Sequence, residues 1–277
     1  MTRPELDWAI EMAASEGWNP GLHDADAFYA ADPDGFIIAC DNGEPVGCVS
    51  AVDYAGEFGF IGFYIVREEL RGRRIGVELG NAAMDRLDGM AVGVDGVFNK
   101  QQSYANIGGF EYAWSNIRYE FENSFSGVPA ASSVRNAADV SFLQLEQYDR
   151  KHFPAPRPDF LKQWIEMPES DALVIMDPND ENIIGFGVIR RCRSGYKIGP
   201  LFADAQIVAE MLMLALCSFA EPGAPVYLDV PDANPLAVDL AESLNMKKVF
   251  GTARMYLGEP PDIAVQNIYG ITSFELG

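Results

Sequence analysis

The chain has 277 residues, about twice the length of one typical domain, which predicts two domains. Hydrophobic residues make up 48% of the sequence, enough to build packed cores and far from the composition of a disordered chain. The 20 basic and 41 acidic residues give a formal net charge of −21, which argues against binding to nucleic acids or to anionic membranes, because both require a basic surface.

The sequence has no pattern typical of a targeting segment, a membrane span or a metal site. Residues 1–17 predict an acidic amphipathic helix rather than a signal peptide, and the longest apolar run, 211–220, is too short to span a bilayer. The four cysteines form no C-x-x-C pair, so we expect reduced and mostly buried thiols. The two histidines, His23 and His152, lie far apart and without metal-ligand spacing. We therefore expect a soluble cytoplasmic protein without a bound metal.

In the first half, apolar spacing predicts the order helix, helix, three strands, helix, strand, short helix, strand. The predicted helices cover 7–16, a short stretch after His23, 75–90 and 102–107, and the predicted strands cover 36–40, 45–54, 57–66, 93–99 and 112–121. Asp41, Asn42 and Gly43 are typical of a hairpin turn between the first two strands. This alternation is typical of a mixed α/β or α+β architecture.

The second half repeats the same order of elements. Its predicted helices cover 138–151, 158–166, 204–219 and 234–244, and its predicted strands cover 172–176, 183–192, 196–201, 226–230 and 248–257. Corresponding elements lie roughly 130 to 140 residues apart, which indicates a duplication of the architecture. The stretch 123–136 is rich in Ser and Ala and favours a domain boundary. We therefore predict tandem domains, 1–125 and 126–277, each built on an α+β mixed sheet.

Half of the basic residues of the first domain fall in one window, between its third predicted strand and the following helix. Of the eight in 1–125, four are Arg67, Arg71, Arg73 and Arg74. The start of a helix offers free N–H groups and a positive dipole, and arginines add bidentate contacts to phosphates. These features favour a bound polyanion such as a pyrophosphate. A solvated arginine cluster paired with Glu68, Glu69 and Glu78 is the alternative, and the strand–glycine–helix setting favours the anion site.

This window resembles the signature of the GNAT superfamily of acyl-CoA-dependent N-acyltransferases, Arg/Gln-x-x-Gly-x-Gly/Ala, which wraps the pyrophosphate of coenzyme A. The match runs through Arg71, Gly72, Ile75 and Gly76 and departs at Arg74, where the family usually has glycine. Val66 holds the position whose backbone faces the thioester and pantetheine in the family. The resemblance implies that acetyl-CoA binds at Ile65, Val66, Arg71, Gly72, Arg73, Arg74, Ile75, Gly76 and Asn99.

The second landmark of the family is a strand followed by a short helix that ends in Gly-Phe. Residues 97–99 and the segment YANIGGF at 104–110 resemble it. In many members a tyrosine four residues before the last glycine protonates the departing thiolate. That position is Ala105 here, and Tyr104 stands one residue earlier. The resemblance implies Tyr104 as the catalytic acid, and a tyrosine packed on the edge of the helix is the alternative.

The second half resembles the C-terminal GNAT-like domain of a two-domain bacterial subgroup, in segments such as HFPAPRPDFL, GYKIGPLFAD and ITSFELG. Its counterpart of the arginine loop, 196–204, lacks the family signature, so we expect a second domain that is degenerate for CoA binding, with Asp204 as a helix N-cap. A second basic cluster is predicted to hold a hairpin against the acidic first domain, with an anion site as the alternative. It consists of Arg190, Arg191, Arg193 and Lys197.

The resemblance thus implies an N-acetyltransferase that moves an acetyl group from acetyl-CoA to a small amine by direct attack in a ternary complex. The amine is expected between the first-domain sheet and the second domain, and the acidic field favours a cationic amine. Glu57 and Asp53 are candidate bases, which nothing in the sequence selects. The alternatives are a non-catalytic acyl-CoA-binding sensor, motivated by the departures at Arg74 and Ala105, and a structural partner that has lost CoA binding.

Overall fold

In a computed structural model of the protein, which describes residues 1–125 and 133–277, the elements follow the predicted order. The helices are α1 (Arg3–Ser15), α2 (Asp24–Ala31), α3 (Ile75–Arg86), α4 (Gln101–Ser103), α5 (Phe142–Asp149), α6 (Pro158–Ile165), α7 (Gln206–Cys217) and α8 (Pro235–Ser243). The strands are β1 (Phe36–Asp41), β2 (Glu44–Tyr54), β3 (Phe58–Val66), β4 (Val92–Val97), β5 (Glu111–Glu122), β6 (Val134–Asn136), β7 (Ser170–Met176), β8 (Ile183–Arg191), β9 (Tyr196–Ala203), β10 (Pro225–Pro231), β11 (Lys247–Leu257) and β12 (Ile268–Gly270).

The differences from the sequence prediction are confined to element ends and short pieces. The helix predicted from 138 begins only at Phe142, after a separate 3-10 turn, and the helix predicted to reach Met90 ends at Arg86. The strands β6 and β12 are new, because three residues are too few to show a periodicity. Residues 126–132 of the predicted boundary lie outside the described part, so the division at residue 125 stays a prediction. Of the helices described, none is long and apolar enough to cross a bilayer.

All twelve strands of the described residues belong to one sheet, in the order β1-β2-β3-β4-β11-β5-β10-β9-β8-β7-β6, with β12 paired to β9 beside this path. Each of β1 to β5 in the first half has a counterpart among β7 to β11 in the second half. The order from β1 inward to β4 and β11 matches the order from β7 inward to β10 and β5, strand for counterpart strand. The predicted duplication is therefore confirmed as a pseudo-two-fold arrangement around the antiparallel pair β5–β11. Each half places its last strand beside the other half: β11 pairs with β4, and β5 pairs with β10.

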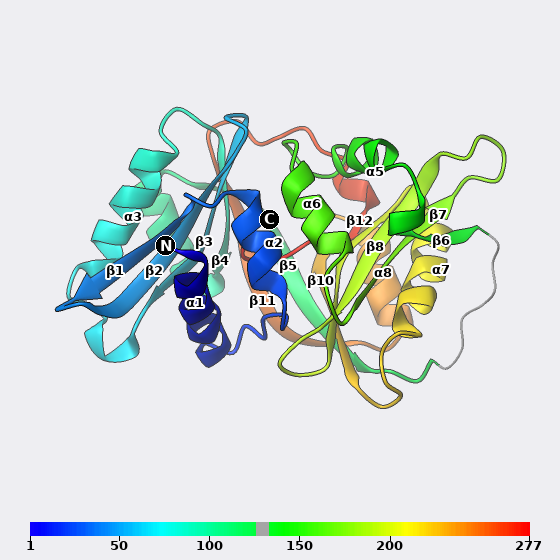
Figure 1. Cartoon of the computed structure of the whole chain (residues 1–277), viewed down its shortest axis with the longest axis horizontal. Coiled ribbons are helices and arrows are strands. Elements are labelled where there is room, and N and C mark those ends of the chain that lie inside the picture. The colour runs from blue at the N-terminus through cyan, green and yellow to red at the C-terminus, as the bar shows by residue number, and fades with distance from the viewer. Residues whose placement is uncertain (126–132) are drawn as a thin grey trace.

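The helices cover the two faces of this sheet differently (Figure 1). On one face α3 packs on β1–β3 and α7 packs on β7–β9, and the two cores there are separate. On the other face α1, α2, α5 and α6 enclose a single core to which both halves contribute. Within this core the rings of Phe28, Trp164 and Phe160 stack on one another, and Phe63 meets Phe28 edge-on. The face that carries α1 and α2 therefore joins the halves.

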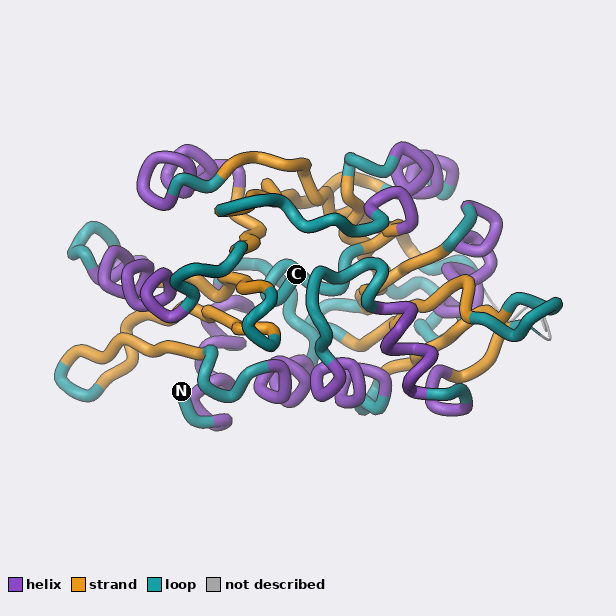
Figure 2. The backbone as a smooth tube through the Cα atoms, turned by 90° about the horizontal axis from the view of Figure 1, so that it is seen from above, coloured by secondary structure: helices purple, strands orange, loops and turns teal. Residues whose placement is uncertain are grey.

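The C-terminal segment 271–277 is buried in this shared core, and its end lies near the middle of the molecule (Figure 2). Two equivalent strands need glycine to let it pass. A methyl group on Gly62 of β3 would lie 1.9 Å from the carbonyl oxygen of Glu275, and one on Gly199 of β9 would lie 2.5 Å from that of Thr272. The segment thus runs between β3 of one half and β9 of the other.

Candidate active site

The parallel strands β3 and β4 separate along part of their length. They pair only from Gly59–Val92 to Ile61–Val94, although β3 continues to Val66 and β4 to Val97. Phe63 has a φ of 45°, and the register between β2 and β3 shifts at the same level, so β3 bends away from β4 here. Beyond Ile61 the backbone groups of β3 that face β4 have no partner in β4. A gap of this kind leaves peptide groups free to hydrogen-bond an extended ligand.

The loop that follows β3 has the geometry of an anion site. A 3-10 turn (Glu68–Leu70) leads into four exposed residues, 71–74, and then directly into α3. Gly72 and Arg74 both have positive φ, 84° and 67°. Because Arg74 is the N-cap of α3 in the left-handed conformation, this position is one that favours glycine. The N–H groups in the first turn of α3 have no intrahelical acceptor and lie at the positive end of the helix dipole.

The arginine side chains of the loop are spread over different neighbours. Arg71 donates from Nε to the carbonyl of Val66 at 3.0 Å and forms an ion pair with Glu16 at the end of α1. The guanidinium of Arg67 lies 6.0 Å from the ring centre of Trp8. Arg73 lines a cavity of about 520 Å³ between β1 and the start of α3. In the part of the chain that is described, none of the four arginines pairs within 4.0 Å with Glu68, Glu69 or Glu78.

Tyr104 lies against the open end of β4, on the face of the sheet that carries α3. It begins a π-helical turn (Tyr104–Gly108), its ring covers Gly96, and the ring of Tyr64 on β3 is 6.4 Å away. Burial, with the phenol of Tyr64 adding to it, raises the pKa of Tyr104 above its usual range. The hydroxyl therefore keeps its proton at neutral pH and can donate it. Asn99 is exposed in the turn just after β4.

The equivalent gap in the second half is filled by the protein itself. Strands β9 and β10 pair only from Tyr196–Val226 to Ile198–Leu228 and then separate, as β3 and β4 do. Here β12 pairs with β9 at Leu201 and Phe202, and the N–H of Ile271 donates to the carbonyl of Asp229 on β10 at 2.9 Å. The backbone groups that are free in the first half are therefore occupied in the second.

The predicted N-cap at Asp204 is wrong. The N-cap of α7 is Ala205, which offers no side-chain hydrogen bond, while the carboxylate of Asp204 accepts a hydrogen bond from the hydroxyl of Tyr148 at 3.0 Å. The hydrogen bond to Tyr148 thus replaces the predicted contact of this carboxylate with the start of α7. The stretch 196–204 contains no arginine and one lysine, Lys197, so it lacks the arginine cluster of the loop 71–74.

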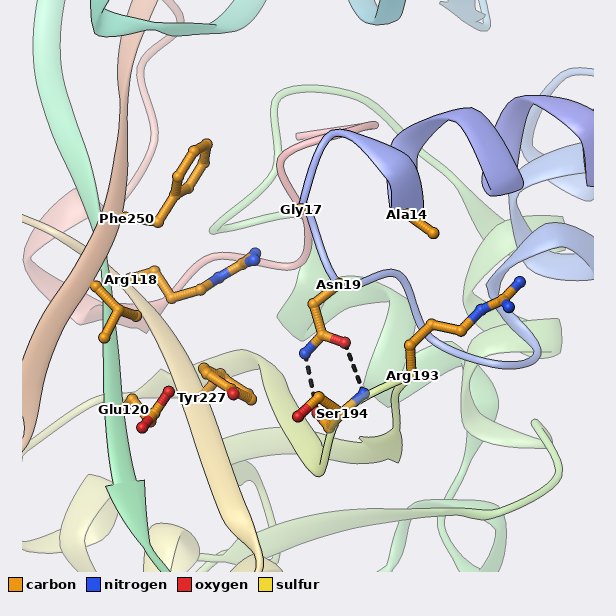
Figure 3. Close-up of a pocket in the computed structure, with 10 residues that line it drawn as sticks. Ala14, Gly17, Asn19, Arg118, Glu120, Arg193, Ser194, Tyr227 and Phe250 are labelled. Carbon is orange, nitrogen blue, oxygen red and sulfur yellow. Dashed lines mark hydrogen bonds between the residues drawn. The ribbon is translucent and has the colours of Figure 1, made fainter.

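A pocket of about 400 Å³ lies between the two halves, on the face opposite Tyr104 (Figure 3). It is lined by Ala14, Gly17, Asn19, Arg118 and Glu120 from the first half and by Arg193, Ser194, Tyr227, Val249 and Phe250 from the second. The guanidinium of Arg118 projects into it from β5 and donates to the carbonyl of Trp18 at 2.7 Å. The sequence analysis expects the acceptor between the first-half sheet and the second half, and this assignment stays a prediction.

Arg118 is one of two buried arginines that the pseudosymmetry relates. It is 3% exposed and forms a bidentate pair with Asp229 across β5–β10, at 2.6 and 2.8 Å. Arg254 forms the same bidentate pair with Asp95 across β11–β4, at 2.8 and 2.6 Å. The sequence reasoning missed both pairs. Their signal is a charged residue inside an otherwise apolar strand, as in VGVDGV and PVYLDVP, repeated in each half.

The second basic cluster holds the β8–β9 hairpin against the first half, as predicted. Arg190 is fully buried and donates to Asp24 of α2 at 2.8 Å, and Arg193 forms an ion pair with Glu11 of α1. Asn19 adds two hydrogen bonds of 2.9 Å to the backbone of Ser194, which fix one wall of the pocket (Figure 3). The pocket is therefore built by contacts between the halves.

The two carboxylates named as candidate bases lie near the start of β3, at the end opposite to the gap. Glu57 is exposed in the β2–β3 turn and pairs with Arg150 at 2.8 Å, while Asp53 accepts the N–H of Gly56 in the same turn. At about 3.3 Å per residue, this turn lies far from Val66 at the other end of the strand. Neither residue is near the gap.

Comparison with known proteins gives consistent matches in both halves. Residues 4–103 match the family model described as "Acetyltransferase (GNAT) family", and residues 145–270 match the one described as "Acetyltransferase (GNAT) domain". The chain is 31% identical over 273 residues to the holothin acyltransferase of a Pseudoalteromonas strain, covering 98% of this chain and 92% of that protein.

Solved structures share the fold. A structure from Pyrococcus horikoshii, provisionally assigned as an acetyltransferase, superposes with a TM-score of 0.83 at 21% identity, covering 100% of this chain and 94% of its own. A tandem GNAT protein of the clavulanic acid biosynthesis pathway superposes with a TM-score of 0.61 at 11% identity, covering 94% and 98%. At these identities the structural matches establish the arrangement of the strands and helices.

Proposed function

The chain belongs to the GNAT family of acyltransferases, and from this premise we propose that it transfers an acetyl group from acetyl-CoA to a small amine. The observation that carries the proposal is the gap between β3 and β4, which opens beside the loop 71–76 and stays free of other strands, while its counterpart in the second half is filled. Phe250 of β11 lines the pocket between the halves and stands two residues from Thr252, the partner of Val97 at the open end of β4.

The residues of the first half fit coenzyme A. The N–H groups at the start of α3, with Gly72, Arg73, Arg74, Ile75 and Gly76 around them, form a cradle for the pyrophosphate. Backbone groups near Ile65 and Val66 are suited to the amides of the pantetheine arm and to the thioester oxygen. Bound here, acetyl-CoA supplies an activated acyl group. Asn99 stands two residues beyond the end of β4, and its proposed contact is with the coenzyme from this side of the gap.

Tyr104 is proposed as the acid that gives a proton to the departing thiolate. Its raised pKa keeps the hydroxyl protonated, and its ring lies over Gly96 at the open end of β4. The acceptor amine is proposed to enter through the pocket on the other face, where Arg118 and Arg193 already have carboxylate partners and Glu120 is a carboxylate of the lining. This charge balance favours a cationic amine, and the volume of about 400 Å³ suits a small one.

The test is calorimetric titration of the protein with acetyl-CoA, followed by thiol release in the presence of tyramine, benzylamine, spermidine or glycine. We expect micromolar binding, and Arg73→Ala/Arg74→Ala should weaken it at least tenfold, since two charge-assisted phosphate contacts are lost. Arg135→Ala/Lys162→Ala makes the same change of net charge on the second half and should leave the affinity unchanged. Absence of binding, or equal affinities for the two double variants, would overturn the proposal.

A further inference from the structure

Glu275 is a buried carboxylate without a direct partner. It belongs to the C-terminal segment and is 2% exposed. Among residues 1–125 and 133–277, its Oε1 has no hydrogen-bond partner, and no basic nitrogen lies within 4.0 Å of the carboxylate. Burying an acidic group in this way costs several kcal/mol when nothing replaces its hydration. A carboxylate at this position therefore needs compensating charge around it.

Glu275 lies at the point where β3 and β4 part. Its carbonyl oxygen is the atom that a methyl group on Gly62 would meet at 1.9 Å, and Gly62 is the first residue of β3 beyond the last β3–β4 pair, Ile61–Val94. The same methyl group would lie 3.0 Å from the hydroxyl oxygen of Ser50 on β2. This hydroxyl is also buried, and no group in the described parts of the chain hydrogen-bonds to it. The unpartnered hydroxyl of Ser50 and the backbone of Glu275 therefore both lie beside the apex of the gap.

Three cationic side chains from three strands surround the carboxylate. Arg118 of β5, Arg190 of β8 and Lys197 of β9 each interact with it electrostatically. Arg118 is bound to Asp229 and Arg190 to Asp24. Lys197 is 2% exposed, and burial, with Arg118 adding to it, lowers the pKa of its ammonium group. Since the two arginines are paired with aspartates, Glu275 and Lys197 are the two charges of this group without a direct partner among the described residues.

The pocket between the halves leads toward Glu275. The preceding residue, Phe274, has its ring 4.7 Å from the guanidinium carbon of Arg118 and 5.8 Å from the ring of Phe250. Arg118 and Phe250 both line the pocket (Figure 3). Going inward from solvent, the order is therefore Arg118 and Phe250, then the C-terminal segment, then Gly62 at the apex of the gap.

We propose that Glu275 is the base of the reaction, so that the second half supplies a catalytic residue to the acyl site of the first. The inference rests on the proposed function. The amine reacts in its uncharged form: its nitrogen forms a bond to the acyl carbon while the carbon–sulfur bond breaks. The nitrogen gives one proton to the Glu275 carboxylate, and the thiolate takes one from the Tyr104 hydroxyl. Glu275 then releases its proton to the solvent, and Tyr104 takes up a proton from the solvent. The overall reaction yields the amide and the free thiol.

The experiment compares the wild-type protein with Glu275→Gln and Glu275→Asp, using the amine of the panel that the wild type turns over fastest. We expect Glu275→Gln to lower kcat about 100-fold, the lower range for loss of a general base, with the affinity for acetyl-CoA within twofold of wild type. The logarithm of its kcat should rise with pH without the plateau of the wild type, because only hydroxide or water then removes the proton. Glu57→Gln, at the distant β2–β3 turn, is the matched control and should keep both kcat and the pH profile.

Glu275→Asp keeps the negative charge within the cluster, so it provides a second test if the glutamine variant fails to fold. It should remain folded, bind acetyl-CoA as the wild type does and lower kcat about tenfold, since the carboxylate is set back by one methylene. A wild-type kcat and pH profile in both variants would overturn the proposal and leave Glu275 with a structural role. If the wild type itself fails to bind acetyl-CoA or to release thiol with any amine, the proposed function falls first and this inference falls with it.

Discussion

His152 is a residue whose environment, rather than its type, decides its chemistry. It is 3% exposed, and its ring stacks on Phe202 at 4.5 Å. Nδ1 lies 2.9 Å from the carbonyl of Tyr148, and in the ranges described Nε2 has no hydrogen-bond partner. Burial lowers the pKa of the imidazole to about 4, so it is neutral at physiological pH. Its place beside Phe153 and Arg157, near the domain boundary, predicts a surface or interface histidine with a role as a base as the alternative, and its burial excludes the surface position.

This shift makes the stability of the protein depend on pH. In the unfolded chain the imidazole titrates near 6.5, and in the folded protein near 4, so acid favours the unfolded chain. The contribution is fully present above about pH 7.5 and is lost as the pH falls through 6.5 toward 4. Between pH 7.5 and 5.0 we expect a loss of about 2 kcal/mol in the free energy of unfolding from this group. Urea unfolding at the two pH values measures it, and in His152→Gln the pH-dependent loss should be smaller by that amount. An equal loss in both proteins would contradict the assignment.

Several residues that matter for the candidate site carried no readable signal in the sequence. Arg118 and Asp229 are 111 positions apart, and only the strand order β11-β5-β10 brings them together. Glu275 sits in a short segment, ITSFELG, without periodicity, and its burial depends on Gly62 and Gly199 from different halves. By contrast, the loop 71–76 was predictable, because it depends on local chain order: a strand, glycines and a helix start.

At the level of the elements, most of the fold could be predicted for a similar reason. Helices such as α3 and α7 pack one face on a sheet, so their apolar spacing follows their geometry, and alternation marks the strands. The pairing of strands could not be predicted, because β11 lies between β4 and β5 although the chain places it in the other half. β12 is the clearest case, since three residues decide what fills the β9–β10 gap.

β12 leads to a prediction about stoichiometry. Because β12 pairs with β9, and the N–H of Ile271 bonds to Asp229 of β10, the C-terminal part of the chain occupies the place in the second gap that a pantetheine arm would need. We expect one acetyl-CoA per chain, measured as the molar ratio in calorimetric titration. The second half also lacks arginines in the loop before α7. A ratio of two, or binding in Arg73→Ala/Arg74→Ala at full affinity and half the original stoichiometry, would show a second site and contradict this interpretation.

At the scale of the whole molecule, the exchange of last strands makes each half depend on the other. Without β11, the strands β4 and β5 of the first half have no strand between them, and without β5 the second half loses the partner of both β10 and β11. The single core on the α1–α2 face, with the C-terminal segment inside it, adds buried apolar surface that neither half could bury alone. The pocket and the buried position of Glu275 exist only where the halves meet.

This dependence predicts the behaviour of a chain cut in two. Fragments 1–129 and 130–277, cut within the stretch 126–132, should each fail to give a cooperative thermal unfolding transition, since exposed strand edges and half a core remain. Mixed or co-expressed, they should assemble in a 1:1 ratio and recover the acetyl-CoA affinity of the intact chain, because every strand pair is restored. Light scattering after gel filtration, circular dichroism and calorimetry measure the three properties. The intact protein, nicked at the same point by an inserted protease site, is the control for the cut itself. A fragment 1–129 that is monomeric, unfolds cooperatively and binds acetyl-CoA with full affinity would show instead that the first half is complete without β11, and that the strand exchange joins two independent domains.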